Sequence, residues 1–395
     1  MNILFVPMPE GGTGHIVPLL ALASRLKDSQ YKTALLLSSQ YHNIVRHLGF
    51  NVLDIDYAQS EGGFLKELSA FKKFNPDVVL DDSSLTTLFS TWVSKKPRVA
   101  IQRTGMYPGA NPRQKNKKYN FDIIISVDKY KDYVKGLGMT EIKHYTDLFA
   151  AEMKIVPGIQ TIEVLPDHLQ SDPTYVFCGP LIANDYFFGV DSPTVEKNGT
   201  GKSDSYKLLE SFFCNNKNRF KVLFTYGTFA SRPQPIFKAI KYLLNNNVAV
   251  IASMKIPELE ESHRDLCFCA NYLPMNFVCS RVDLMIHHCG SGTYQYQILH
   301  QLPSITIGTD FQDREDVAIR LEELGVNCHL PSPDDCENFL QLFQGIVEKY
   351  AQLSSPLYQA AKKKLVKLKE ETDRVCAAFD LQWVLEQAVE RFARI

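Results

Sequence analysis

The chain has 395 residues, which is too long for one ordinary hydrophobic core, so its length predicts two domains. Apolar residues make up 45% of the chain and charged residues 22%, as is typical of water-soluble globular proteins. The formal net charge of -1 gives no electrostatic case for binding nucleic acid, and no apolar stretch reaches the roughly 20 residues that a membrane-spanning helix needs.

The N-terminal run MNILFVPM lacks the charged start and the long apolar stretch of a signal peptide, and it is predicted to form a first strand. Nine cysteines lie scattered along the chain without a CxxC pair. An odd number of cysteines without a secretory signal predicts reduced thiols and a cytoplasmic protein.

Strand-like and helix-like segments alternate in the first half of the chain. An apolar run at 3–7 predicts a strand, small residues occupy 11–14, and a helical pattern covers 16–26. The other predicted elements are strands at 33–39, 76–82, 99–104 and 123–128 and a helix at 41–49. Continuous Val, Ile and Leu runs separated by helical patterns predict a parallel sheet covered by helices on both faces.

The composition changes at residues 186–219, which are rich in Gly, Ser, Asn and Lys and are predicted to form a linker or exposed loop. The alternation then restarts, with predicted strands at 221–227, 248–253, 284–290 and 304–310. The sequence therefore predicts an α/β protein with two doubly wound domains, at 1–185 and 220–370, and a terminal helix at 371–395. Ligands are expected in a cleft between the domains, at the carboxyl ends of the strands.

The turn after the first predicted strand carries a candidate base. His15 lies in the first turn of the predicted helix, with Pro18 where a helix still tolerates proline. The positive end of the helix favours a neutral imidazole, which can act as a base near pH 7. Asp81 or Asp82, at the end of the strand 76–82, can hold its other nitrogen. Taken alone, a histidine at this position is more often a helix-cap or core residue, and the alternative for the aspartates is an N-cap of the next helix.

The turn after the predicted strand 284–290 has the composition of an anion-binding loop. His288 precedes Cys289 and four small residues at 290–293, after which a helical pattern begins. Small residues let backbone N–H groups approach a phosphate, and the helix N-terminus favours negative charge. A tight turn without a ligand is the alternative.

A metal site is a further alternative for this region, because six possible ligands lie close in sequence: Cys267, Cys269, Cys279, His287, His288 and Cys289. Adjacent strand residues point to opposite faces, and the spacings match no common zinc pattern. We therefore predict no metal.

Both loops, in this order, resemble those of the GT-B glycosyltransferases of the UDP-glycosyltransferase superfamily, in its inverting family 1. The segment GHIVP at 14–18 resembles the family's GHxxP start, and HCGSGT at 288–293 resembles its HxGxGT donor loop. Further matching segments are FTYGT at 224–228, YLP at 272–274, LP at 302–303 and DR at 313–314. The resemblance covers nearly the whole chain and is thinner between residues 50 and 150.

The resemblance implies two Rossmann-like domains facing a cleft, with the C-terminal helix crossing back to the N-terminal domain. It implies metal-independent transfer of a sugar, with inversion, from a nucleotide diphosphate donor to an acceptor hydroxyl, without any other cofactor. His15 would take the acceptor proton, oriented by Asp82 or Asp81. The other site residues implied are Gly12, Thr13 and Gly14 near the reacting centre; Thr228, His288, Gly290, Ser291, Gly292 and Thr293 at the diphosphate; Tyr272 and Leu273 at the base; and Asp313 and Arg314 at the sugar.

The sequence departs from the family pattern at three positions. Cys289 stands where bacterial members have Gly and plant members have Cys. Tyr296 replaces a Glu that binds the ribose in many UDP-sugar users, which leaves dTDP as well as UDP as the nucleotide. Arg314 replaces a Gln, and it is expected either to recognise a carboxylate-bearing or unusual sugar or to pair with Glu315, Asp316 or another carboxylate. The motif Asp54-Ile55-Asp56, a metal motif in the other glycosyltransferase fold, is predicted to mark a strand end.

The acceptor is expected over the first domain, beside loops that carry six large apolar side chains: Tyr57, Phe64, Phe71, Phe74, Met106 and Tyr107. Such side chains suit a lipophilic or aromatic acceptor, such as a natural product. Alternatives within the fold are a glycolipid-forming transferase and a sugar-nucleotide epimerase, and a non-catalytic partner subunit is another. A nicotinamide-dependent oxidoreductase is disfavoured because the turn at 11–14 lacks the third glycine of the dinucleotide fingerprint.

Overall fold

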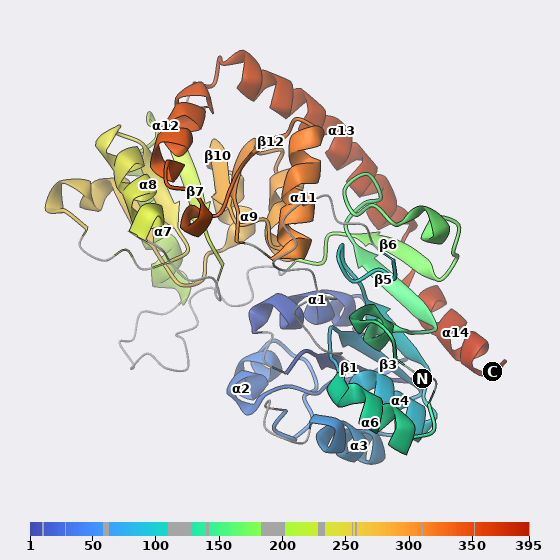
Figure 1. The fold of residues 1–395 in the computed structure, drawn as a ribbon. Coiled ribbons are helices and arrows are strands. Elements are labelled where there is room, and N and C mark those ends of the chain that lie inside the picture. Colours follow the sequence, from blue (N-terminus) through green and yellow to red (C-terminus); the bar gives the residue numbers. More distant parts are fainter. Residues whose placement is uncertain are drawn as a thin grey trace. The chain divides into compact units, whose positions relative to one another are not determined.

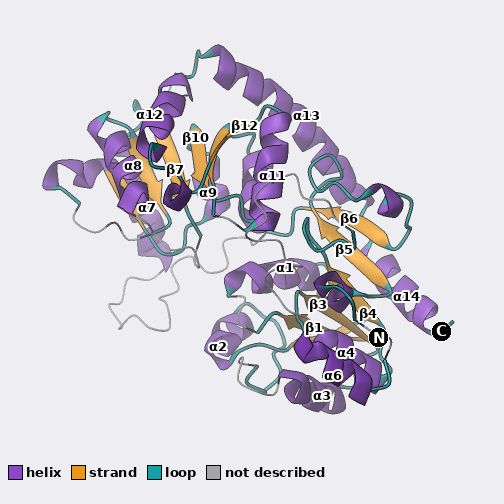
Figure 2. Ribbon diagram, viewed as in Figure 1, coloured by secondary structure: helices purple, strands orange, loops and turns teal. Residues whose placement is uncertain are grey.

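The computed structural model describes residues 1–9, 12–27, 29–57, 63–109, 128–139, 142–182, 202–227, 234–254, 256, 259–309, 311–350 and 352–394. The chain divides into two compact units, one formed by Met1–Ala183 with Asp373–Ile395 and the other by Asn184–Thr372. Figure 1 follows the chain by colour, and Figure 2 shows that each unit has its strands inside and its helices outside.

A six-stranded parallel sheet forms the centre of the first unit, with strand order β2-β1-β3-β4-β5-β6. Its strands are β1 (Asn2–Pro7), β2 (Lys32–Leu35), β3 (Val78–Asp82), β4 (Arg98–Ile101), β5 (Met153–Pro157) and β6 (Tyr175–Gly179). Its helices are α1 (Thr13–Ser24), α2 (Ser39–His47), α3 (Gly63–Phe74), α4 (Thr87–Ser94), α6 (Asp128–Gly136) and α14 (Leu381–Phe392), with 3-10 turns at Tyr145–Phe149 and Asp167–Leu169. The strands are apolar on both faces because helices cover both, and residues 3–6 of β1 have no solvent exposure.

The second unit contains another six-stranded parallel sheet, with strand order β12-β11-β10-β7-β8-β9. Its strands are β7 (Lys221–Thr225), β8 (Ala249–Ala252), β9 (Cys267–Cys269), β10 (Leu284–His287), β11 (Ser304–Ile307) and β12 (Asn327–Leu330). Its helices are α7 (Lys202–Asn215), α8 (Gln234–Asn245), α9 (Met275–Cys279), α10 (Ser291–Leu299), α11 (Gln312–Glu323) and α12 (Phe339–Tyr350), with 3-10 turns at Glu261–Leu266 and Pro333–Asp335.

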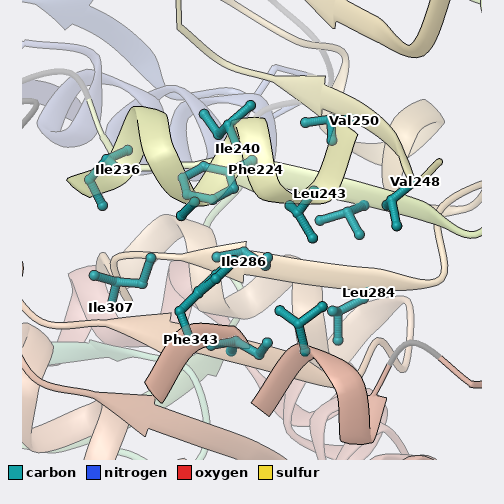
Figure 3. Close-up of a cluster of buried hydrophobic side chains, with 14 of the residues drawn as sticks. Phe224, Ile236, Ile240, Leu243, Val248, Val250, Leu284, Ile286, Ile307 and Phe343 are labelled. Carbon is teal, nitrogen blue, oxygen red and sulfur yellow. The ribbon is translucent and has the colours of Figure 1, made fainter. Parts of the chain in front are cut away.

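The core of the second unit fixes the strands that lead to the candidate site. Figure 3 shows Ile240 and Leu243 of α8 and Phe343 of α12 around the strand residues Phe224 and Ile286. All five are fully buried, and burying a side chain of this size stabilises the fold by about 1.5–3 kcal/mol. The strands β7 and β10 are therefore held in a well-packed layer, and the loops of the candidate site begin at their carboxyl ends.

The end of the chain forms two helices where the sequence predicts one. α13 (Pro356–Ala378) contains the boundary between the two units, and α14 begins after Asp380, whose carboxylate accepts hydrogen bonds from the backbone N–H groups of Gln382 and Trp383. α14 contacts β3, β4 and β5 of the first unit, as Figure 1 shows for β5. Its buried face includes Val384 and Leu385, whereas Trp383 is 44% exposed.

The prediction of a linker or exposed loop at 186–219 is wrong for residues 202–215, which form α7. This helix buries Leu209, and Phe212 and Phe213 are 8% exposed. The segment is polar overall, which favoured the prediction of a loop. The helical spacing of Leu209, Phe212 and Phe213 would have indicated a helix with one apolar face. Residues 186–201 lie outside the described ranges.

Eight of the predicted strands coincide with observed ones, but β2, β4, β7, β10 and β11 end two or more residues before the predicted limits of 39, 104, 227, 290 and 310. The sequence interpretation missed β5, β6, β9 and β12. Residues 226–227 and 288–290, which lie between the observed strand ends and the predicted limits, belong to the loops of the candidate site. The strand predicted at 123–128 lies outside the described residues except for Asp128, which begins α6. No helix among the described residues has the length and apolar character that crossing a membrane requires.

Candidate functional site

Each sheet has a point where the order of its strands reverses. In the first unit, β1 lies between β2 and β3, and in the second, β7 lies between β8 and β10. Doubly wound sheets bind ligands at the carboxyl ends of the strands beside such a reversal, because the loops there diverge. The two histidines singled out from the sequence lie at these points, His15 after β1 and His288 after β10.

His15 is held at the edge of the first sheet by a short turn. Gly12, with φ 56°, precedes α1 in a left-handed conformation that glycine adopts without steric cost, and Thr13 and Gly14 begin the helix. Nδ1 of His15 lies 3.0 Å from Oδ1 of Asp82, and the His15 side chain is 23% exposed. A carboxylate at Nδ1 favours the tautomer with its proton there, which leaves the lone pair on Nε2. The ring is therefore partly exposed and oriented by a carboxylate.

The Asp82 carboxylate has a second partner that sequence reasoning missed. Arg103, just beyond β4, places Nη1 2.5 Å from Oδ1 and Nη2 2.5 Å from Oδ2 of Asp82, and Ser83 donates its hydroxyl proton to Oδ1. Both charged side chains are almost completely buried. Burial alone would raise the pKa of Asp82, but Arg103 and His15 outweigh it and hold that pKa well below its usual range. Asp82 is therefore an anion whose position is fixed from two sides.

Asp81 does not contact His15. It points the other way from the strand and forms a separate buried pair with Arg98, with Nε to Oδ1 at 2.6 Å and Nη2 to Oδ2 at 3.0 Å. Of the two aspartates left open by the sequence, the structure places Asp82 against His15 and Asp81 in a structural ion pair.

The loop after β3 is held by a buried carboxylate on α3. Glu67 accepts hydrogen bonds from five hydroxyl groups, those of Tyr57, Ser84, Thr86, Thr87 and Ser90. This network fixes the segment 83–90, which directly follows Asp82. It also shows that Tyr57 belongs to the protein interior.

The large apolar side chains expected beside the acceptor are mostly core residues. Tyr57, Phe71, Met106 and Tyr107 are each at most 6% exposed. Tyr107 nevertheless keeps its hydroxyl group buried without a hydrogen-bond partner among the described residues, as does Oε1 of Gln102 at the end of β4. These two atoms belong to the same β4 loop as Arg103.

In the second unit, the ring of His288 is enclosed by glycine backbone. A Cβ atom added at Gly227 would lie 2.9 Å from Nε2 of His288, and one added at Gly290 would lie 2.5 Å from it, so neither position accepts a side chain without moving the ring. His288 is 7% exposed, and its Nδ1 has no hydrogen-bond partner among the described residues. Burial, with smaller contributions from Arg314 and His287, lowers the pKa of His288 well below the ordinary value, so the ring is neutral near pH 7.

His287 faces the opposite way and has a structural role. Its Nδ1 accepts the backbone N–H of Cys289 at 3.1 Å, and its Nε2 lies 3.3 Å from Oε1 of Gln297. Burial lowers its pKa to about 4, so it too is neutral. The bond to Cys289 stabilises a residue with φ 56°, a left-handed conformation that explains why glycine also suits this position.

The loop leads directly into the N-terminus of α10. Gly290 precedes the helix, Ser291 and Gly292 open its first turn, and the backbone N–H of Thr293 donates to the Gly290 carbonyl at 2.7 Å. The first N–H groups of a helix have no intrahelical acceptor and attract anions. Gly292 is exposed, and a Cβ there would meet nothing within 4 Å.

The remaining predicted residues lie in other loops at the carboxyl edge of the second sheet. Tyr272 and Leu273 follow β9, and Asp313 and Arg314 lie in the first turn of α11, after β11. Thr228, the remaining diphosphate candidate, lies outside the described residues.

The structure brings no metal-binding cluster together among the residues it describes. Sγ of Cys267 lies 3.6 Å from Sγ of Cys269, but His287 and His288 point to different surroundings. In the Asp54-Ile55-Asp56 motif, Asp56 accepts the backbone N–H of Ser39 at 2.8 Å and so caps α2.

Arg103 and Glu67 are the site-supporting residues that sequence reasoning missed. A signal was present for Arg103, because a charged residue at the end of an otherwise apolar strand requires a buried partner. The partner itself, 21 residues away, depends on how β3 and β4 align, which pairs Asp82 with Ile101.

Neither a protein-family model nor a curated protein sequence matches the chain. Solved structures match it over its full length. One described as the glycotransferase of kitacinnamycin has 15% sequence identity and a TM-score of 0.67, over 99% of this chain and 98% of its own. The spinosyn rhamnosyltransferase SpnG complexed with thymidine diphosphate has 16% identity and a TM-score of 0.65, over 98% and 100% of the two chains.

The glycosyltransferase VinC in complex with dTDP matches similarly, with 12% identity and a TM-score of 0.65 over the whole of both chains. These matches confirm the fold predicted from the sequence, an α/β architecture with two parallel sheets of the GT-B type. Identities this low establish the fold, and the chemistry rests on the residues at the two strand-order reversals.

Proposed function

We propose that this protein is a metal-independent inverting glycosyltransferase, which moves a sugar from a nucleotide diphosphate donor to a hydroxyl group of a small lipophilic or aromatic acceptor. The observation that carries the proposal is the contrast between the two histidines. His15 is partly exposed and bound at Nδ1 by a carboxylate, whereas His288 is neutral, buried and enclosed by glycine backbone.

The first unit supplies the base. When an acceptor hydroxyl attacks the anomeric carbon, its proton must leave, and Nε2 of His15 is the atom placed to take it. The imidazolium so formed keeps its Nδ1–H bond to Asp82, which stabilises the new positive charge. Arg103 holds Asp82 in the ionised form that this requires. The turn at Gly12, Thr13 and Gly14 leaves room for the acceptor, because a Cβ at Gly14 would meet nothing within 4 Å.

The second unit binds the donor. Breaking the bond between the anomeric carbon and the diphosphate oxygen places negative charge on the departing diphosphate. Preorganised hydrogen-bond donors stabilise that charge. The first turn of α10 at Ser291 and Gly292 supplies N–H groups, and neutral His288 supplies a ring N–H. We assign Thr228 and Thr293 to the same group, Tyr272 and Leu273 to the nucleotide base, and Asp313 to the sugar.

Both dTDP and UDP fit the proposal as the donor nucleotide. Tyr296 in α10 is 8% exposed and carries no carboxylate to accept hydrogen bonds from both ribose hydroxyls. The structures of SpnG and VinC contain thymidine diphosphate, which supports a dTDP-sugar as the first donor to test. The likeness to a glycotransferase of kitacinnamycin supports a natural product as the acceptor class.

The test combines donor binding with turnover. Calorimetric titration with UDP, dTDP and GDP should give a measurable Kd for at least one nucleotide, and His288→Ala should weaken it. Release of nucleotide diphosphate from the preferred donor, with a panel of phenolic and aliphatic hydroxyl acceptors, then measures transfer. We expect His15→Ala to bind the donor as the wild type does and to lose roughly 10²-fold or more in turnover.

Equal turnover in His15→Ala would remove that residue from its proposed role. Donor binding without turnover across the acceptor panel would instead support a non-catalytic partner subunit. Conversion of the sugar nucleotide to an isomer without any acceptor would indicate an epimerase.

A further inference from the structure

Arg314 is a cation without a counterion in the described part of the chain. It lies in the first turn of α11, its guanidinium carbon is 4.6 Å from the centre of the Phe311 ring, and the structure records no ion pair for it among the described residues. Its Nη1 is buried and has no hydrogen-bond partner there. A buried donor left unpaired costs free energy, so the arrangement calls for an explanation.

The position of Arg314 does not serve the stability of α11. The first turn of a helix favours negative side chains and disfavours positive ones. The nearest sequence alternative, an ion pair with Glu315, is not formed, because Glu315 accepts the backbone N–H of Thr309 at 2.7 Å and lies 2.8 Å from Nε2 of His329. The guanidinium is thus held by stacking on Phe311 and is not matched to a protein anion.

Two other unpartnered polar atoms lie in the loops that flank Arg314. His288 follows β10, and Thr309 follows β11. Nδ1 of His288 and Oγ1 of Thr309 are each buried without a hydrogen-bond partner among the described residues. β10 and β11 are adjacent and parallel, so both loops leave the same edge of the sheet, and Tyr226 connects them by donating to the Gly308 carbonyl at 2.8 Å while its ring packs against His288. Three unsatisfied atoms at one edge indicate a polar ligand.

The charge at this edge is also incomplete. A nucleotide diphosphate carries negative charge on each phosphate, yet neutral His288 contributes no full positive charge to balance it. A guanidinium offers two parallel N–H donors that match the paired oxygens of a phosphate or a carboxylate.

We propose that Arg314 binds an anionic oxygen group of the donor, beyond the part of the diphosphate that the first turn of α10 holds. This rests on the proposed donor site and deepens it, because it adds a charged side chain of α11 to the groups that bind the donor. The shared chemistry is an oxyanion, and its source is either the terminal phosphate of the diphosphate or the carboxylate of a nucleotide-activated hexuronic acid.

The experiment compares wild type, Arg314→Gln and Arg320→Gln by isothermal titration. Arg320 is the matched control, because it lies on the same helix and pairs with Glu323 at 3.1 Å. The probes are nucleoside monophosphate, nucleoside diphosphate, UDP-glucose, UDP-glucuronate and inorganic pyrophosphate. Since Arg314 has no recorded protein counterion, we expect Arg314→Gln to keep the thermal unfolding temperature of the wild type without ligand.

We expect Arg314→Gln, but not Arg320→Gln, to weaken the binding of at least one of these anionic probes by roughly 10-fold or more. A loss for diphosphate and pyrophosphate with unchanged monophosphate binding identifies the terminal phosphate. A loss confined to UDP-glucuronate identifies the sugar carboxylate.

Equal affinities of wild type and Arg314→Gln for every probe would overturn the inference while leaving the donor site intact. Arg314-dependent binding of pyrophosphate in a protein that binds no nucleotide would leave the anion site standing and refute the proposed function. Absence of binding to all probes would overturn both.

Discussion

Asp82 and Arg103 form a two-point buried ion pair, in which each terminal nitrogen of the arginine lies 2.5 Å from a different carboxylate oxygen. One of those oxygens also faces Nδ1 of His15 at 3.0 Å. The proposed base is therefore oriented by an anion whose charge is already balanced by a second cation. The pair Asp82–Arg103 is neutral as a whole, and it holds the imidazole in one orientation.

Replacing Arg103 should change the pH dependence of turnover as well as its rate. In Arg103→Gln the buried carboxylate keeps His15 as its main partner, which favours the imidazolium and removes the base. We expect the acidic limb of the kcat/KM profile to move to higher pH by about one unit. Arg103→Lys, which retains the charge but not the two-point geometry, should lose rate with a smaller displacement of the limb.

A purely structural role for Arg103 would lower the rate at every pH and leave the limb where it is. Nitrogen-15 NMR of the His15 ring, assigned by the signal missing in His15→Gln, provides a readout independent of turnover. An unchanged Nδ1–H tautomer and titration in Arg103→Gln would contradict the proposed coupling.

Asp81 and Asp82 should separate by function, although both stabilise the first unit. Asp81→Asn leaves Arg98 as an uncompensated buried cation, and we expect it to cost about 3–5 kcal/mol of unfolding free energy. The double variant Asp81→Asn with Arg98→Met should recover part of this loss and turn over like the wild type. Asp82→Asn, in contrast, should lose roughly 10²-fold or more in kcat.

Both tryptophans, Trp92 and Trp383, belong to the first unit, so intrinsic fluorescence during urea unfolding reports on this unit. Turnover of the double variant as low as that of Asp82→Asn would show that the Asp81–Arg98 pair acts in the site and not only in the fold.

The sequence predicted the local parts of the site better than its long-range contacts. The turn before His15 and the small-residue loop after His288 could be predicted because neighbouring residues form each of them. Choosing Asp82 over Asp81 required the alignment of β1 and β3, which pairs Pro7 with Asp82. A shift of one residue exchanges the two faces of a strand, and no local pattern fixes it.

The same limit explains two of the errors of the sequence interpretation. The place of Tyr57 after a strand predicts a position near an acceptor, yet its hydroxyl reaches Glu67 in the interior. The apolar face of α7 is concealed by a polar surrounding sequence. Each outcome depends on a partner distant in sequence.

We predict that glycine at position 292 gives the donor access to the first turn of α10 but makes the protein less stable than alanine would. It lies in the first turn of α10 in open space, so Gly292→Ala should stabilise the apo protein by about 0.5–1 kcal/mol because alanine favours helix. The added methyl group should nonetheless weaken binding of the nucleotide diphosphate, since it occupies space beside the N–H groups of that turn. Calorimetry and thermal unfolding measure the two effects separately.

Gly345 in α12 is the matched control, because it is also helical and a Cβ atom added there would meet nothing within 4 Å. Gly345→Ala should give a similar stabilisation without any change in nucleotide affinity. Tighter or unchanged binding in Gly292→Ala would mean that the donor does not approach this turn.

His287 should make the second unit less stable in acid. Its pKa is about 4 in the folded protein because the ring is buried, against about 6.5 in the unfolded chain. Below pH 6.5 the unfolded state therefore binds a proton that the folded state does not, so stability falls as the pH falls toward 4 and levels off below it. This difference in pKa corresponds to about 3 kcal/mol of unfolding free energy. The lowered pKa of His288 reduces stability in acid in the same way.

Replacing His287 by Gln should lower stability at pH 7, since the hydrogen bond to the N–H of Cys289 is weakened, and should flatten the pH dependence between 6.5 and 4 by about one proton. Hydrogen exchange of β10 amides during urea titration reports on the second unit, which contains no tryptophan. An equally steep loss of β10 protection in His287→Gln and wild type would show that the acid sensitivity of this unit arises from other groups.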